Sequence, residues 1–133
     1  MNDKPLFTYD YYEPGKVYGV TEFTVDEAVV AKWRSVYPGD NDPGVMPAGM
    51  LAMIIVGAVL TCNAPRPPGG VHGGQSFDVR RMPRIGETLL TEVKCLDKEI
   101  KKERKWVRAL TTTRSKDTGE IVLTGIMTTL VAQ

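Results

Sequence analysis

The sequence is poor in the residues that build metal and redox sites. It contains two cysteines, Cys62 and Cys95, and a single histidine, His72, in 133 residues. The cysteine spacing fits neither a metal ligand set nor a redox pair, so we interpret both as reduced, buried thiols of a cytoplasmic protein. One histidine cannot supply a multi-histidine metal site. The sequence therefore predicts no metal centre.

An excess of charge of one sign is also missing. The chain has 17 Lys and Arg against 16 Asp and Glu, whereas nucleic-acid-binding proteins usually carry a basic excess. Bulk charge therefore gives no support for a nucleic-acid partner. The first residues, Met-Asn-Asp-Lys-Pro, are polar and no apolar segment follows them directly, so we expect no signal peptide.

The longest uncharged run, residues 44–62, approaches the length of a bilayer-spanning helix. It has Pro47 near its start, several small residues, and no flanking basic or aromatic belt. The segments after it have the character of strands and need an apolar element to cover them. We therefore interpret the run as a buried core helix and expect no membrane partner.

Two helices are expected in the first half of the chain. The capping-box pattern of residues 24–27 predicts the start of a short helix that ends before Pro38. Its apolar face is expected to carry Val29, Val30, Trp33, Val36 and Tyr37. Pro47 suits the first turn of a second helix that runs to about Asn63. This helix is apolar nearly all round, so we expect other structure to cover most of its sides.

The remaining segments alternate like strands. The expected strands are Val17–Val25, His72–Met82, Thr88–Lys98, Trp106–Arg114 and Ile121–Ala132. The charged stretch Lys98–Lys105 is interpreted as the solvated end of a hairpin. The two expected helices precede four of the five expected strands. This order favours an α+β fold with an antiparallel sheet over a fold with a parallel sheet. We expect one domain, residues 1–133, in which a curved sheet wraps around the long apolar helix.

Three motifs occur in a fixed order along this pattern. Residues 39–45 read Gly-Asp-Asn-Asp-Pro-Gly-Val, residues 47–51 read Pro-Ala-Gly-Met-Leu, and residues 83–89 read Pro-Arg-Ile-Gly-Glu-Thr-Leu. They resemble the hydratase motif, the helix start and an inter-strand turn of the MaoC-like enoyl-thioester hydratases. The resemblance implies a single hot-dog domain, an acyl thioester substrate, and no cofactor beyond the coenzyme A or acyl carrier that the substrate carries.

The resemblance also implies a catalytic site. Asp40 stands at the position of the family's catalytic Asp, and Gly49 at that of the glycine whose amide stabilises the enolate oxygen. Val45 stands where the family has its catalytic His, and Asp42 replaces the motif Asn. Tyr37, Asp42 or a residue of a partner subunit could take over the missing role. Alternatively, Asp40 and Asp42 are turn residues of a Pro/Gly-rich loop.

Further candidates concern substrate binding. Met46 and Met50 could line an acyl tunnel or fill the core, the commoner use of methionine. Arg80 and Arg84, with the neighbouring Arg81, could bind the phosphates of coenzyme A, or could form a solvated hairpin end. His72 could be a structural histidine or could replace the histidine that the motif lacks.

The primary hypothesis is a hydratase or dehydratase that adds water to, or removes it from, an acyl thioester. Asp40 would act as the base and the Gly49 amide would stabilise the enolate. The alternative is a catalytically degenerate binding or partner subunit, and a third possibility is thioester hydrolysis. The family places its site at a subunit interface, so we expect a homodimer or a heterodimer with another hot-dog subunit.

Overall fold

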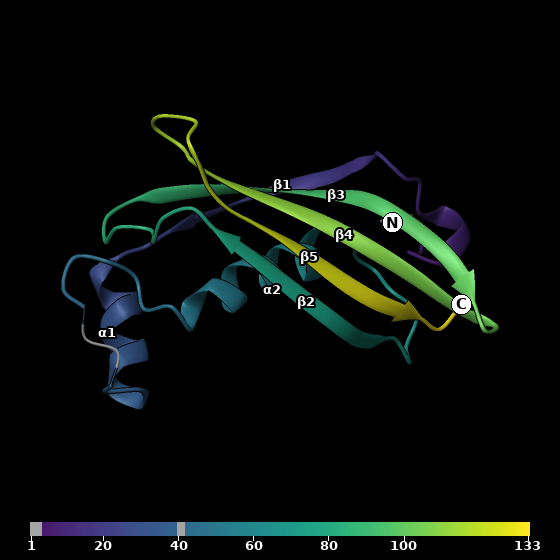
Figure 1. The fold of residues 1–133 in the computed structure, drawn as a ribbon, viewed down its shortest axis with the longest axis horizontal. Helices are drawn as coiled ribbons and strands as arrows, with labels where there is room; N and C mark the ends of the chain where they lie inside the picture. The colour runs from purple at the N-terminus through teal and green to yellow at the C-terminus, as the bar shows by residue number, and fades with distance from the viewer. Residues whose placement is uncertain (1–3, 40–41) are drawn as a thin grey trace.

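A computed structural model describes residues 4–39 and 42–133 of the chain. Its strands form one five-stranded antiparallel sheet in the order β1-β3-β4-β5-β2 (Figure 1). The strands are β1 (Val17–Thr24), β2 (Val71–Val79), β3 (Thr88–Lys101), β4 (Arg104–Ser115) and β5 (Ile121–Val131). The helical elements are η1 (Tyr9–Tyr11), α1 (Glu27–Val36) and α2 (Met50–Cys62). The predicted α+β architecture is confirmed.

The core lies between α2 and one face of the sheet. Alternate residues of the central strands are buried there, as the period of two in a strand requires; on β3 these are Leu89, Thr91, Val93 and Cys95. Ile54, Ile55, Ala58 and Val59 of α2 pack against this layer. The alternation predicted for β3 is confirmed.

The closest approach between helix and sheet depends on a glycine of the sheet. A Cβ at Gly125 of β5 would lie 2.8 Å from Cδ1 of Ile55 and 2.9 Å from the carbonyl oxygen of Ser76. On the helix, Ala58 is buried, but Ala52 and Gly57 are exposed. Of these three small residues of α2, only Ala58 therefore packs against the sheet.

The ends of both helices differ from the predictions. Asp26, not Thr24, caps α1, because its Oδ1 accepts the amide of Val29 at 2.7 Å. Thr24 is the last residue of β1 and its hydroxyl lies 3.0 Å from that of Thr88. The second helix begins at Met50 rather than Pro47.

The covering of α2 also differs from the prediction. Its side away from the sheet is open, with Met53 43% and Leu60 41% exposed. On α1, Val30 is buried, whereas Val36 and Tyr37 are exposed. Both helices therefore leave apolar side chains uncovered in the isolated chain.

The sheet order places β2 at an edge. Strands β3, β4 and β5 follow one another as hairpins, but β2 pairs with β5 rather than with β3. Strands β3 and β4 continue through most of the charged stretch to a turn at Lys102 and Glu103. Cys62 and Cys95 are free thiols, and burial raises the pKa of both. None of the helices in residues 4–39 and 42–133 is long and apolar enough to cross a membrane.

Candidate functional site

The segment that leads from the hydratase-like motif to α2 is fixed to the turn before β3. The amide of Met46 donates to the carbonyl of Pro83 at 2.8 Å, and the amide of Ile85 donates to the carbonyl of Gly44 at 3.0 Å. Val45, between these contacts, forms a β-bridge with Arg84. The backbone around Val45 is therefore held in an extended form against the sheet.

A second set of hydrogen bonds to this segment comes from α1. The guanidinium of Arg34 donates from Nη2 to the carbonyl of Asp42 at 2.6 Å and to that of Val45 at 3.3 Å. Residues 42–46 are thus held by α1 on one side and by the turn before β3 on the other.

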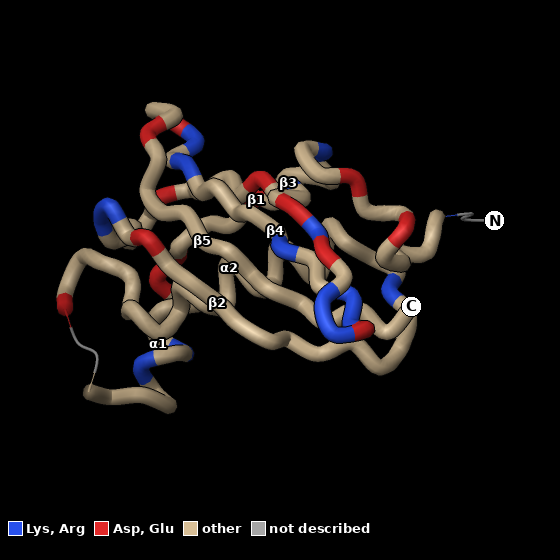
Figure 2. Tube along the Cα trace, turned by 45° about the vertical axis from the view of Figure 1, so that its right-hand side comes forward, with Lys and Arg blue, Asp and Glu red and all other residues tan. Residues whose placement is uncertain are grey.

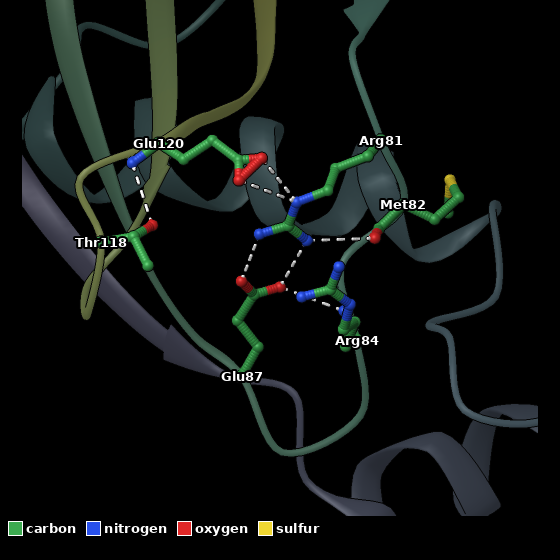
Figure 3. A network of polar contacts seen from close by, with 6 residues as sticks. All are labelled: Arg81, Met82, Arg84, Glu87, Thr118 and Glu120. Carbon is green, nitrogen blue, oxygen red and sulfur yellow. Dashed lines mark hydrogen bonds and ion pairs between the residues drawn. The ribbon is translucent and has the colours of Figure 1, made fainter.

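An ion-pair network holds the turn at residues 83–87. Arg81 donates to both carboxylate oxygens of Glu87, at 3.0 and 2.6 Å, and to Glu120 at 2.9 Å (Figure 3). Glu87 also accepts the amide of Arg84 at 3.0 Å. The hydrogen bonds from Arg81 lower the pKa of Glu87 to about 2. One guanidinium therefore joins the turn that supports Val45 to the hairpin between β4 and β5.

The lowered pKa predicts a dependence of stability on pH. Because the ordinary pKa of a glutamate is higher, the Arg81–Glu87 pair contributes fully above about pH 4.5, and its contribution is lost as the pH falls toward 2. The Glu87→Gln variant should be less stable at neutral pH by up to about 3 kcal/mol, with a shallower decline in acid. Urea unfolding between pH 2 and 7 measures both. The matched control is Glu92→Gln, since Glu92 forms no ion pair with a described residue, and equal acid profiles for the two variants would contradict the assignment.

The N-terminus of α2 presents a free donor. Gly49 is exposed, precedes the first residue of the helix, and its amide donates to no oxygen of the described residues. No side chain of residues 4–39 or 42–133 caps this end, and no acidic residue lies in the first turn. The positive end of the helix dipole adds to the field there. This arrangement can stabilise negative charge that develops on a carbonyl oxygen.

Gly49 is packed against α1. A Cβ at this position would lie 2.5 Å from Cζ2 of Trp33, so the indole occupies the space of a side chain. The ring of Tyr37 packs on Trp33, with 4.6 Å between ring centroids. The structure thus connects Tyr37 to Gly49 through Trp33, a residue that the sequence placed in the core and not at the site.

The other motif residues that the structure describes differ in exposure. Asp40 falls outside the described residues. Asp42 is exposed, and Val45, at the position of the family's His, is half-buried. The described part of the loop therefore presents one carboxylate, that of Asp42, to solvent.

The predicted substrate-binding residues separate into two pairs. Met46 and Met50 are 1% and 0% exposed in the main core cluster, where they fill space between α2 and its neighbours. Arg80 and Arg84 are exposed at the end of β2 and in the following turn, and neither forms an ion pair with a described residue. Arg81, between them, is engaged by Glu87 and Glu120.

A cavity of about 540 Å³ lies at the opposite end of α2, where Val56 and Leu60 form part of its wall. Since α2 has 13 residues, its two ends are about 20 Å apart. Tyr12, Arg66, His72 and Thr129 contribute polar side chains to the lining. Burial raises the pKa of Tyr12 to about 12, so its hydroxyl stays protonated at neutral pH.

The sequence did not identify this cavity, because its walls come from segments far apart in the chain: residues before η1, the end of α2, β2 and β5. His72 lies here and not near Gly49, with Nε2 3.1 Å from the carbonyl oxygen of Gly74. The cluster of tyrosines at residues 9–12 was the available signal for packed structure in this region. Among the described residues, no three His, Cys, Asp or Glu side chains gather as metal ligands.

No protein-family model and no curated protein matches the sequence, but solved structures match the fold over almost all of it. R-hydratase PhaJ1 from Pseudomonas aeruginosa is 21% identical, with a TM-score of 0.73 over 95% of this chain and 86% of that one. A MaoC-like dehydratase from Rhodospirillum rubrum is 17% identical, with a TM-score of 0.74 over 93% and 95%. The 3R-hydroxyacyl-ACP dehydratase complex HadBC from Mycobacterium tuberculosis is 14% identical, with a TM-score of 0.70 over 88% and 96%. The chain thus has the hot-dog fold, in the form found in MaoC-like hydratases and dehydratases.

Proposed function

We propose that the protein is a hydratase or dehydratase that acts on an acyl thioester carried by coenzyme A or an acyl carrier. The observation that carries this proposal is the free amide of Gly49 at the N-terminus of α2, next to the segment that follows Asp40. Addition of water across an enoyl thioester develops negative charge on the thioester oxygen, which such a donor stabilises. The reaction requires no cofactor beyond the carrier in the substrate.

In this reaction Asp40 acts as the general base toward water, and the proton returns to the α-carbon of the enolate. Val45 has no proton to exchange, so a second group is needed to orient the water. Asp42, which is exposed on the same loop, and Tyr37, which packs on Trp33 beside Gly49, are the described side chains of this region with suitable chemistry. Arg80 and Arg84 are proposed to meet the carrier phosphates, because their guanidinium groups form no ion pair with a described residue.

We further propose that two subunits pair through β2, either as a homodimer or with another hot-dog chain. Strand β2 is a sheet edge, and Val71, Phe77 and Val79 are exposed on it. A two-fold axis makes the paired strands antiparallel, and with them the two copies of α2. The cavity end of one α2 then lies toward the Gly49 end of the other. This pairing brings the cavity, whose walls include apolar side chains of Val56, Leu60 and Met127 that suit an acyl chain, toward the proposed catalytic end, in the cytoplasm where such carriers occur.

The second candidate is an acyl-thioester-binding or partner subunit that does not itself catalyse the reaction. The half-buried Val45 at the position of the family's His favours it, because loss of one proton-transfer group commonly costs about 10²- to 10⁴-fold in rate.

One assay separates the two candidates. Purified protein mixed with crotonyl-CoA should lower the absorbance of the enoyl thioester as water adds. Saturable binding of crotonyl-CoA without turnover would reject the enzyme and support the binding subunit. Turnover that appears only when a second hot-dog chain is added would assign this chain to a heterodimer.

A further inference from the structure

We propose that the outer face of the β3–β4 hairpin is a binding site for a phosphorylated nucleotide. This site lies on the side of the sheet away from α2 and does not depend on the proposed acyl-thioester reaction. Val107 and Ala109 of β4 are buried on the inner face of the sheet, Ala109 against α2 and Val107 against Phe7 and Tyr12, so the alternate residues Trp106 and Arg108 project to the opposite face.

The centre of the site is the indole of Trp106. A Cβ at Gly73 of β2 would lie 3.0 Å from Cζ3 of Trp106 and 3.7 Å from the carbonyl oxygen of Thr128. The ring therefore extends from β4 across β5 to β2 and lies close over the backbone at Gly73. Trp106 is half-buried, and a ring held in this way offers a fixed surface on which a nucleobase can stack.

Cations surround this ring. A hollow of about 390 Å³ is lined by Trp106 and Thr128 together with the charged residues Glu99, Lys101, Lys102, Arg104 and Arg108. The register places Lys101 opposite Arg104 and Glu99 opposite Trp106. The lining thus combines an aromatic surface, four cations and one carboxylate, and Figure 2 shows Lys and Arg gathered at the tip of this hairpin.

Most of the cations at the tip form no ion pair with a described residue. Arg108 is paired with Asp97 at 2.6 Å, but Lys101, Lys102 and Arg104 form no ion pair with a described residue. Three unpaired positive charges beside one aromatic ring match the phosphates and the base of a nucleotide. Glu99 can accept a hydrogen bond from a ribose hydroxyl or an exocyclic amino group.

The turn itself supports a role for these side chains. Lys102 and Glu103 have φ angles of 53° and 65°, a left-handed conformation that Asn and Gly adopt more easily in a two-residue hairpin. A charged side chain in this conformation opposes the local preference of the backbone, which points to a use for the charge. Free nucleotides and the nucleotide part of coenzyme A share the required chemistry.

The test is a titration of the full-length protein with ADP, coenzyme A, adenosine and inorganic pyrophosphate, followed by calorimetry. ADP should bind at least tenfold more tightly than either adenosine or pyrophosphate, because only ADP engages both the ring and the cations. The double variant Lys101→Gln/Arg104→Gln should lose at least tenfold in ADP affinity and little in adenosine affinity. Trp106→Leu should lose about tenfold for both. Lys32→Gln, an exposed change on α1, is the matched control and should match the wild type.

Tighter binding of coenzyme A than of ADP, lost in Lys101→Gln/Arg104→Gln, would identify the carrier nucleotide as the occupant of the hairpin. Equal affinities that the same variant weakens would identify a free nucleotide; both results agree with the proposal, and affinities that this variant leaves unchanged would overturn it. Pyrophosphate that binds as tightly as ADP would overturn it, since the hairpin would then be a charge patch without base recognition. Absence of ADP binding at millimolar concentration would also overturn it, even if an acidic protein bound. Because Lys101 and Arg104 are exposed, their double variant is expected to fold, and it tests the site even if Trp106→Leu is unstable.

Discussion

Replacing Asp40 with asparagine is expected to lower the rate of crotonyl-CoA hydration by about 10²- to 10⁴-fold, because the amide cannot accept the proton that the attacking water releases. Asparagine keeps the size of the side chain and much of its hydrogen bonding. The Michaelis constant should therefore change much less than kcat. Initial rates from enoyl absorbance, measured over a range of substrate concentrations, give both constants.

The matched control is Asp42→Asn, which alters a carboxylate two residues away on the same loop. If Asp42 is a turn residue, this variant keeps near wild-type activity. If both variants are slow and their effects do not add, the two carboxylates act as a unit. Full activity of Asp40→Asn would remove Asp40 from the mechanism.

A second large effect is expected at Gly49. In Gly49→Ala the new Cβ would lie 2.5 Å from Cζ2 of Trp33, so the indole or the start of α2 must move. We expect a loss of about 1–3 kcal/mol in the free energy of unfolding, as for other overpacked sites. We also expect a fall of about 10²- to 10³-fold in kcat, as when an oxyanion donor is displaced. Urea unfolding and the crotonyl-CoA assay measure the two effects.

Gly57→Ala is the matched control within the same helix. Apart from the adjoining backbone of α2, no described atom lies within 4 Å of a Cβ at Gly57, so alanine should stabilise α2 by about 0.5–1 kcal/mol and leave kcat unchanged. Combining Gly49→Ala with Trp33→Phe, which shortens the ring, should restore stability and part of kcat. Activity that does not recover together with stability would show that the glycine amide is not the group displaced.

The fold was predictable where one local pattern decided it. The alternation of Leu89, Thr91 and Val93 identified the buried face of β3, since a strand on a core needs that period. The cap of α1 was not predictable in the same way. Thr24 and Asp26 both suit an N-cap, and the choice depends on the contact of Thr24 with Thr88, a residue 64 positions away.

The site was predictable to a similar degree. The resemblance located Gly49 at the start of the helix, but the contact with Trp33 depends on how α1 and α2 pack. Three arginines at residues 80–84 look alike in the sequence. Only the position of Glu87 and Glu120 in the folded chain separates the paired Arg81 from the unpaired Arg80 and Arg84.

The hydrogen bonds that hold Gly44–Met46 bear on the order in which parts of the protein fold and unfold. The segment Gly44–Met46 has its place only when the turn at residues 83–86 is already formed, and that turn depends on Arg81 reaching Glu87. In folding, this segment is therefore expected to take its place after the turn at residues 83–86 has formed. In unfolding, the same segment can open while the sheet persists, because its hydrogen bonds to the turn at residues 83–86 and to Arg34 lie outside the ladders that pair the strands. Mild denaturant would then abolish activity in molecules whose circular dichroism is still that of the native sheet.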